Sequence, residues 1–98
     1  MLHIINKSTL TSGTLDTCLN TAAGGDILLI EDAVYAATRG NAAEAKLKAA
    51  MGRFKLHVLM PDLEARGMGD RLIEGVSPVD YGGFVELASN NKTCQSWL

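Results

Sequence analysis

Two cysteines are the residues of this 98-residue chain with the clearest capacity for covalent chemistry, and they lie far apart, at Cys18 and Cys94. Their spacing fits neither a disulfide scaffold nor a Cys-x-x-Cys redox or zinc motif. Cys18 falls one turn into an expected helix, whose N-terminus could activate a thiol modestly for persulfide or disulfide exchange. The competing interpretation is structural, because Leu15, Cys18 and Leu19 share the spacing of a buried helix face. We favour a buried thiol, with a sulfurtransferase acting through Cys18 as an alternative.

Three aspartates offer a second kind of site. Asp32, Asp62 and Asp80 each follow a predicted strand, so they would share the edge of the sheet at which the strands end. Clustered carboxylates can bind Mg²⁺ there, as in phosphoacceptor domains. Each aspartate also directly precedes a predicted helix, where a side-chain cap is worth about 1 kcal/mol. We therefore expect helix caps and predict no metal site.

Two further sets of polar residues have weaker claims to chemistry. The loop from Ser8 to Thr14 offers hydroxyls and amides ahead of a helix N-terminus, which could hold a phosphate. It lacks the GxxxxGK[ST] and GxGxxG spacings, so no cofactor is predicted, although a stand-alone flavodoxin-like module binding phosphate or flavin remains an alternative. His3 and His57 fall early in their strands, away from that edge, with no ligand at metal spacing. We expect both histidines to be satisfied by hydrogen bonds.

These residues are positioned by an expected alternation of strands and helices. The predicted strands cover residues 2–6, 27–30, 55–60 and 75–79, with a fifth in the tail at 93–98; the predicted helices cover 15–23, 33–39, 42–51, 61–67 and 81–88. The strand at 27–30 is apolar on both faces, which is typical of a central parallel strand. The alternation predicts a single three-layer α/β/α domain over residues 1–98, with a mostly parallel sheet of four to five strands.

The composition argues against several classes of function. With a net charge of −2 and no stripe among its nine lysines and arginines, the chain is not expected to bind nucleic acid directly. Its apolar runs are far shorter than the roughly 20 residues that span a bilayer, and no signal pattern opens the chain, so we expect a cytoplasmic protein without membrane contact. A mean hydropathy of +0.10 leaves some apolar residues outside so small a core, which favours oligomerisation.

Four large side chains are the predicted contacts with partner chains. Val34 and Tyr35 lie in a predicted helix that is apolar nearly all round, Phe84 lies in the last helix, and Trp97 stands near the end of the chain. The sequence has no convergent set of acid, base and nucleophile, which fits a packing subunit better than a complete enzyme. Catalysis by the chain alone is therefore not expected.

Several segments, taken in order, resemble the TusB/DsrH family of small sulfur-relay subunits. They cover nearly the whole chain and read LHIINKS, GTLDTCL, GGDILLIEDAVYAATRGN, KLHVLMPDLEARG and SPVDYGGFVELASNNKTCQSWL. The resemblance implies a three-layer α/β fold. It also implies assembly with two paralogous chains, TusC- and TusD-like or DsrF- and DsrE-like, into a heterohexamer that holds two copies of each.

The same resemblance implies where the sulfur chemistry lies. In that family the persulfide cysteine is on the TusD or DsrE partner, which passes sulfur to a TusE- or DsrC-like carrier. This chain agrees, because the loops at its predicted sheet edge contain no cysteine. The TusB-like route ends in 2-thiolation of the wobble uridine of certain tRNAs, and the DsrH-like route belongs to cytoplasmic sulfur oxidation. The NKS opening and Cys18 bring the chain slightly closer to the DsrH side, and either route makes it an accessory subunit.

Overall fold

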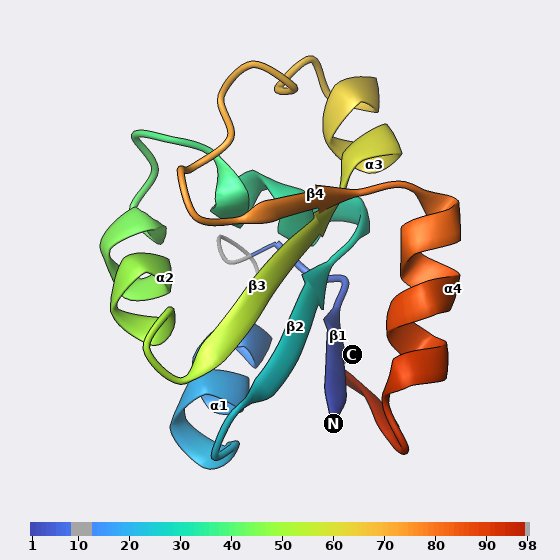
Figure 1. Cartoon of the computed structure of the whole chain (residues 1–98). Coiled ribbons are helices and arrows are strands. Elements are labelled where there is room, and N and C mark those ends of the chain that lie inside the picture. The colour runs from blue at the N-terminus through green and yellow to red at the C-terminus, as the bar shows by residue number, and fades with distance from the viewer. Residues whose placement is uncertain (9–12, 98) are drawn as a thin grey trace.

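A computed structural model describes residues 1–8 and 13–97 of the chain, with a five-stranded sheet at its centre (Figure 1). The strands are β1 (Leu2–Ile5), β2 (Gly25–Leu29), β3 (Phe54–Leu59), β4 (Ser77–Val79) and β5 (Cys94–Trp97). All pair in parallel, in the order β4-β3-β2-β1-β5. The predicted parallel sheet is confirmed, and so is the fifth strand, which pairs with β1 at the edge of the sheet.

Helical segments connect each strand to the next. They are α1 (Thr14–Thr21), the 3₁₀ helix η1 (Glu31–Ala37), α2 (Glu44–Ala50), α3 (Met60–Ala65) and α4 (Tyr81–Asn90). The prediction of an α-helix over residues 33–39 was wrong in the type of helix, because amides in this segment bond three residues back, as from Ala33 to Ile30 and from Thr38 to Tyr35. Over the described ranges, no helix has the length and apolarity to cross a membrane.

One face of the sheet holds the main hydrophobic core, and we call it the core face. Because side chains alternate along a strand, Ile27 and Leu29 of β2 point to the same side as Leu56 and Val58 of β3. These residues join one buried cluster with residues from four helical segments, which include Leu15 and Leu19 of α1, Val34 of η1, Leu47 of α2 and Leu63 of α3. The core face is thus covered by α1, η1, α2 and α3.

The opposite face, which we call the α4 face, carries the alternate strand residues such as Asp26 and Leu28. β4 and β5 lie at opposite edges of the sheet. The segment that connects them, which contains α4, therefore crosses over the strands between them on the α4 face (Figure 1). Asn91, just after α4, bonds Asp26 on this face. None of the residues of α4 is fully buried. The three-layer architecture is confirmed, but among the described residues only α4 forms the third layer.

The aspartates at the carboxyl ends of the strands fulfil the predicted capping role in one case of three. The Asp80 carboxylate accepts a hydrogen bond of 2.7 Å from the Gly83 amide and caps α4. Asp62 and Asp32 do not cap, because α3 begins at Met60 and η1 at Glu31, which places both aspartates inside the first turn. They bond across the edge instead, as described below.

Candidate functional site

Cys18 lies inside the core face and is fully buried. It sits on α1 between Leu15 and Leu19, which are also buried, as the helical spacing predicted. Burial raises the pKa of its thiol to about 11 from an ordinary value of 9.0. A thiol in this environment has neither the access nor the ionisation that sulfur transfer needs. Cys94 is exposed on the edge strand β5.

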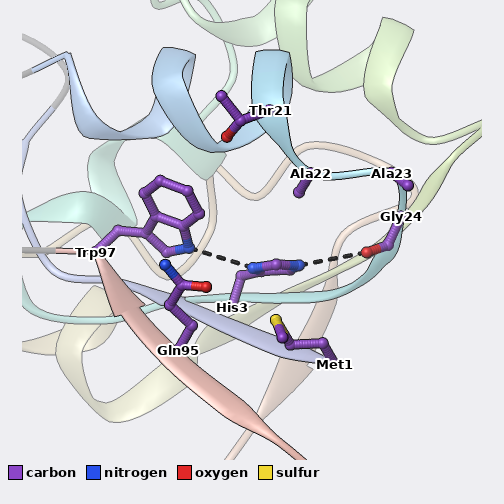
Figure 2. A pocket seen from close by; sticks show the side chains of 8 residues that line it. All are labelled: Met1, His3, Thr21, Ala22, Ala23, Gly24, Gln95 and Trp97. Carbon is purple, nitrogen blue, oxygen red and sulfur yellow. Dashed lines mark hydrogen bonds between the residues drawn. The ribbon is translucent and has the colours of Figure 1, made fainter.

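A depression of about 430 Å³ lies between the end of α1 and β5, at the amino ends of the strands (Figure 2). Its lining is mostly apolar and consists of Met1, His3, Thr21, Ala22, Ala23, Gly24, Gln95 and Trp97. The volume falls within the range of small-ligand sites, which is about 300–1,000 Å³. Among these lining residues there is no carboxylate or thiol.

His3 connects the two sides of this depression through hydrogen bonds. The Trp97 indole Nε1–H donates to His3 Nδ1 at 3.2 Å, and His3 Nε2 lies 3.3 Å from the carbonyl oxygen of Gly24 (Figure 2). Because an indole nitrogen only donates, Nδ1 must accept, and the ring proton sits on Nε2 facing Gly24. Both ring nitrogens are therefore engaged within the chain. The expectation that His3 is satisfied by hydrogen bonds is confirmed.

A second polar cluster, which sequence reasoning missed, lies on the α4 face. His57 Nε2 is 2.9 Å from Asp26 Oδ1, and the Asn91 amide donates to Asp26 Oδ2 at 3.3 Å and to the Leu87 carbonyl at 2.8 Å. Burial alone would raise the pKa of Asp26, but the hydrogen bonds from His57 and Asn91 and the nearby charges of His57 and Lys55 outweigh it, so that the pKa lies below its ordinary value. The cluster fastens the end of α4 to the sheet.

The carboxyl edge of the sheet is held by one ion pair and by hydrogen bonds among the described residues. Arg66 lies 2.9 Å from Asp32 and also donates to the Asp62 carbonyl, while the Asp62 carboxylate accepts from the Glu31 amide at 2.7 Å. Glu31 has a φ of 50°, which turns the chain sharply after β2.

In residues 1–8 and 13–97, no three His, Cys, Asp or Glu side chains are grouped to hold a metal ion. Most of the hydroxyl-rich loop, at residues 9–12, lies outside the described residues.

The four predicted contact residues occupy different environments. Val34 is fully buried within the chain's own core, where η1 packs against α2 and α3, so its predicted contact with a partner was wrong. Tyr35 is 36% exposed beside a depression at the carboxyl edge. Phe84 is half-buried on α4. Trp97 is largely engaged with His3 and the core, and only its remaining surface is open to a partner.

Solved structures support this description of the fold. The chain superposes on the ychN protein from E. coli with a TM-score of 0.81 over 97% of both chains, at 17% identity. It also matches MTH1491, a protein of unknown function from Methanobacterium thermoautotrophicum, with a TM-score of 0.68 over 97% of this chain and 95% of that one, at 19% identity. At these identities the likeness defines a class of small three-layer α/β domains with a parallel sheet.

Sequence comparison narrows that class to a family. Residues 7–94 match the model of the DsrH-like proteins. The chain is 37% identical over 98 residues to Protein TusB of Pectobacterium parmentieri, covering 99% of this chain and 100% of the relative, and 43% identical over 77 residues to Protein TusB of Erwinia tasmaniensis, covering 78% of each. The chain belongs to the TusB/DsrH family of small sulfur-relay subunits. These relatives carry the name TusB, so they give no support to the slight preference for the DsrH side.

Proposed function

We propose that this chain is an accessory subunit of a cytoplasmic sulfur-relay complex that serves 2-thiolation of the tRNA wobble uridine, and that it carries no sulfur itself. The family supports the relay, and the TusB relatives, similar over nearly their full length, support the tRNA branch. Sulfur oxidation with DsrF- and DsrE-like chains is the second branch of the same family. The NKS opening and Cys18 resemble that branch, whereas the relatives matched over their full length carry the name TusB.

The burial of Cys18 is the observation that carries the accessory role. With a pKa of about 11, its thiol is ionised in only about one molecule in ten thousand at neutral pH, and its sulfur has no exposed surface. The thiolate is the nucleophile in persulfide chemistry. Cys94 is exposed, and among the described residues no side chain forms a hydrogen bond or ion pair with its thiol that would activate it. The persulfide is therefore assigned to a partner chain.

The partners of this proposal are the two paralogous chains of the heterohexamer, TusC- and TusD-like, with a TusE-like carrier that takes sulfur from the complex. Contact with the paralogues is assigned to the residues that the fold leaves at the surface, Tyr35 at the carboxyl edge and Phe84 on α4, with a smaller share for the open part of Trp97. Such an assembly also accounts for the apolar character of so small a domain.

The test is to tag the chain in its native cells, purify it with its companions and weigh each intact chain by mass spectrometry. We expect two companions of similar size in equal ratio. We also expect an added sulfur atom on one companion and none on this chain, and Cys18→Ala combined with Cys94→Ser should leave that result unchanged. An added sulfur on this chain that disappears in Cys18→Ser would contradict the accessory role.

A further inference from the structure

We infer that His3 is a proton-sensitive lock for the edge strand β5, closed when its imidazole is neutral and opened when the imidazole is protonated. This device goes beyond the proposed function, because it concerns how β5 is held to the rest of the chain and not which partners the chain meets. It rests on the burial of β5, on the hydrogen bonds of His3 and on the charges around the imidazole.

β5 has little of its own surface to hold it in place. Cys94, Gln95 and Ser96 are exposed, whereas Trp97 is partly buried and packs against the hydrophobic core. In the described part of the chain, the strand lies at the edge of the sheet and pairs with β1 alone. A short strand with one neighbour and few buried side chains opens easily, so the contacts of Trp97 decide how firmly β5 is attached.

The hydrogen bond from Trp97 to His3 requires a neutral imidazole. The indole Nε1–H donates to His3 Nδ1 at 3.2 Å, while Nε2, which carries the ring proton, faces the Gly24 carbonyl at 3.3 Å. Figure 2 shows the imidazole between these two partners. An imidazolium has a proton on each nitrogen and accepts at neither. A proton on Nδ1 would face the indole proton, so the bond to Trp97 and a charged His3 exclude one another.

A charged His3 would also lack a counter-ion. His3 is only 3% exposed, and the residues that line the depression around it include no carboxylate. The charged groups beside it are cations. One is the Arg53 guanidinium, 5.1 Å from the centre of the Phe54 ring that packs edge-on against His3, and the other is the α-amino group of Met1. A buried charge without a partner is unfavourable, so protonation favours an open state in which water reaches the ring.

Other titratable groups of α1 and of the neighbouring strands are turned away from His3 or keep their protonation state. They are Asp16 and Cys18 of α1, Asp26 of β2, and Lys55 and His57 of β3. The three strand residues lie on the α4 face, opposite to His3. Asp16 pairs with Lys46, and burial raises the pKa of the Cys18 thiol to about 11, which keeps it protonated. The lock is therefore controlled by His3 between about pH 8 and pH 5.

Nuclear magnetic resonance on the full chain tests the lock over this pH range, which lies above the one in which Asp26 takes up a proton. At pH 8, spectra of the ¹⁵N-labelled imidazoles should show the His3 proton on Nε2. On acidification to pH 5, the indole signal of Trp97, the single tryptophan, should shift. The exchange protection of the β5 amides, corrected for the intrinsic effect of pH, should fall by about fivefold or more, and that of β2 and β3 should not.

Three variants separate the lock from other effects of acid. His3→Gln offers an amide oxygen to the indole and an amide proton to Gly24 but takes up no proton, so β5 should stay protected at both pH values. Trp97→Phe keeps a ring against the core without the donor and should lose most of the change. His57→Gln, the matched control at the second of the two histidines, should retain the wild-type fall. The Met1 amine is present in every variant and cannot cause a difference between them.

Three results would overturn the inference. They are a His3 proton on Nδ1 at pH 8, unchanged protection of β5 between pH 8 and pH 5 in the wild type, and a fall that persists in His3→Gln or is missing from His57→Gln. Should His3→Gln not fold, Trp97→Phe decides, because a fall as large as that of the wild type would contradict the lock. None of these measurements involves companion chains, so the lock and the proposed function can fail separately.

Discussion

On the core face of the sheet, four helical segments bury residues such as Val34 and Leu47 completely, whereas on the α4 face one helix lies over the strands and none of its residues is fully buried. The first arrangement is a conventional hydrophobic core. The second buries strand leucines such as Leu2, Leu28 and Leu59 beneath half-buried helix residues, and it adds the polar cluster of Asp26, His57 and Asn91. The contrast teaches that the two faces of one sheet differ in how completely their helices are buried, and the following predictions test that difference.

Matched leucines on the two faces should give the largest difference. Leu47→Ala, in α2, empties a fully buried site and should lower the free energy of unfolding by about 3 kcal/mol. Leu87→Ala, in α4, removes a half-buried side chain and should cost about 1 kcal/mol. Urea denaturation of the two variants measures both values, and equal costs would show that the α4 face is packed as a core.

The buried thiol should make the core face sensitive to alkali. The folded-state pKa of Cys18, about 11, lies above the ordinary value of 9.0, so on raising the pH the unfolded chain loses this proton first. Stability is complete below about pH 9 and falls toward pH 11, by about 2 kcal/mol. Denaturation curves across this range should show that Cys18→Ala lacks this decrease and that Cys94→Ala, a matched change at an exposed position, retains it. A slope unaffected by Cys18→Ala would contradict the burial.

The α4 face should be sensitive to acid instead. The pKa of Asp26 is below its ordinary value in the folded chain, so its contribution is present at neutral pH and is lost as the pH falls below about 4. Asp26→Asn should cost about 1 kcal/mol at neutral pH and flatten the acid limb of the stability curve. Asn91→Ala should speed hydrogen exchange at the end of α4. The exposed control Asp70→Asn should change neither measurement.

Tyr35 should give the smallest effect on stability. It is the partly exposed aromatic residue at the carboxyl edge, and Tyr35→Ser should cost about 1 kcal/mol or less. The variant should nevertheless recover less of the companion chains, while Tyr35→Phe should recover them normally if the ring makes the contact. Normal recovery of the companions with Tyr35→Ser would contradict the contact assigned to Tyr35.

Much of the fold could be predicted from the sequence because local signals agree with it. The run at 27–30 predicted a central strand, and the spacing of Leu15, Cys18 and Leu19 predicted a buried helix face, as the structure has them. The prediction for Val34 was wrong because a helix that is apolar on all sides does not reveal which side faces the core. Val34 is buried by the packing of η1 against α2 and α3 of the same chain.

The polar cluster on the α4 face could not be found in this way. Asp26 and Asn91 are 65 residues apart, and their meeting depends on the strand order and on the passage of α4 across the sheet. Asp26 and His57 meet through the register of β2 and β3. Neither pairing leaves a local pattern. Long-range geometry of this kind is what a single sequence lacks.

The central claim, an accessory subunit that carries no sulfur in tRNA thiolation, is tested most directly by weighing tRNA nucleosides from cells that lack this chain. The account predicts that 2-thiolated wobble uridine is lost in these cells. It further predicts that the wild type and the Cys18→Ala, Cys94→Ser double variant restore it to the same level. Unchanged thiolation in the deletion strain, or restoration by the wild type alone with the double variant still folded, would contradict it.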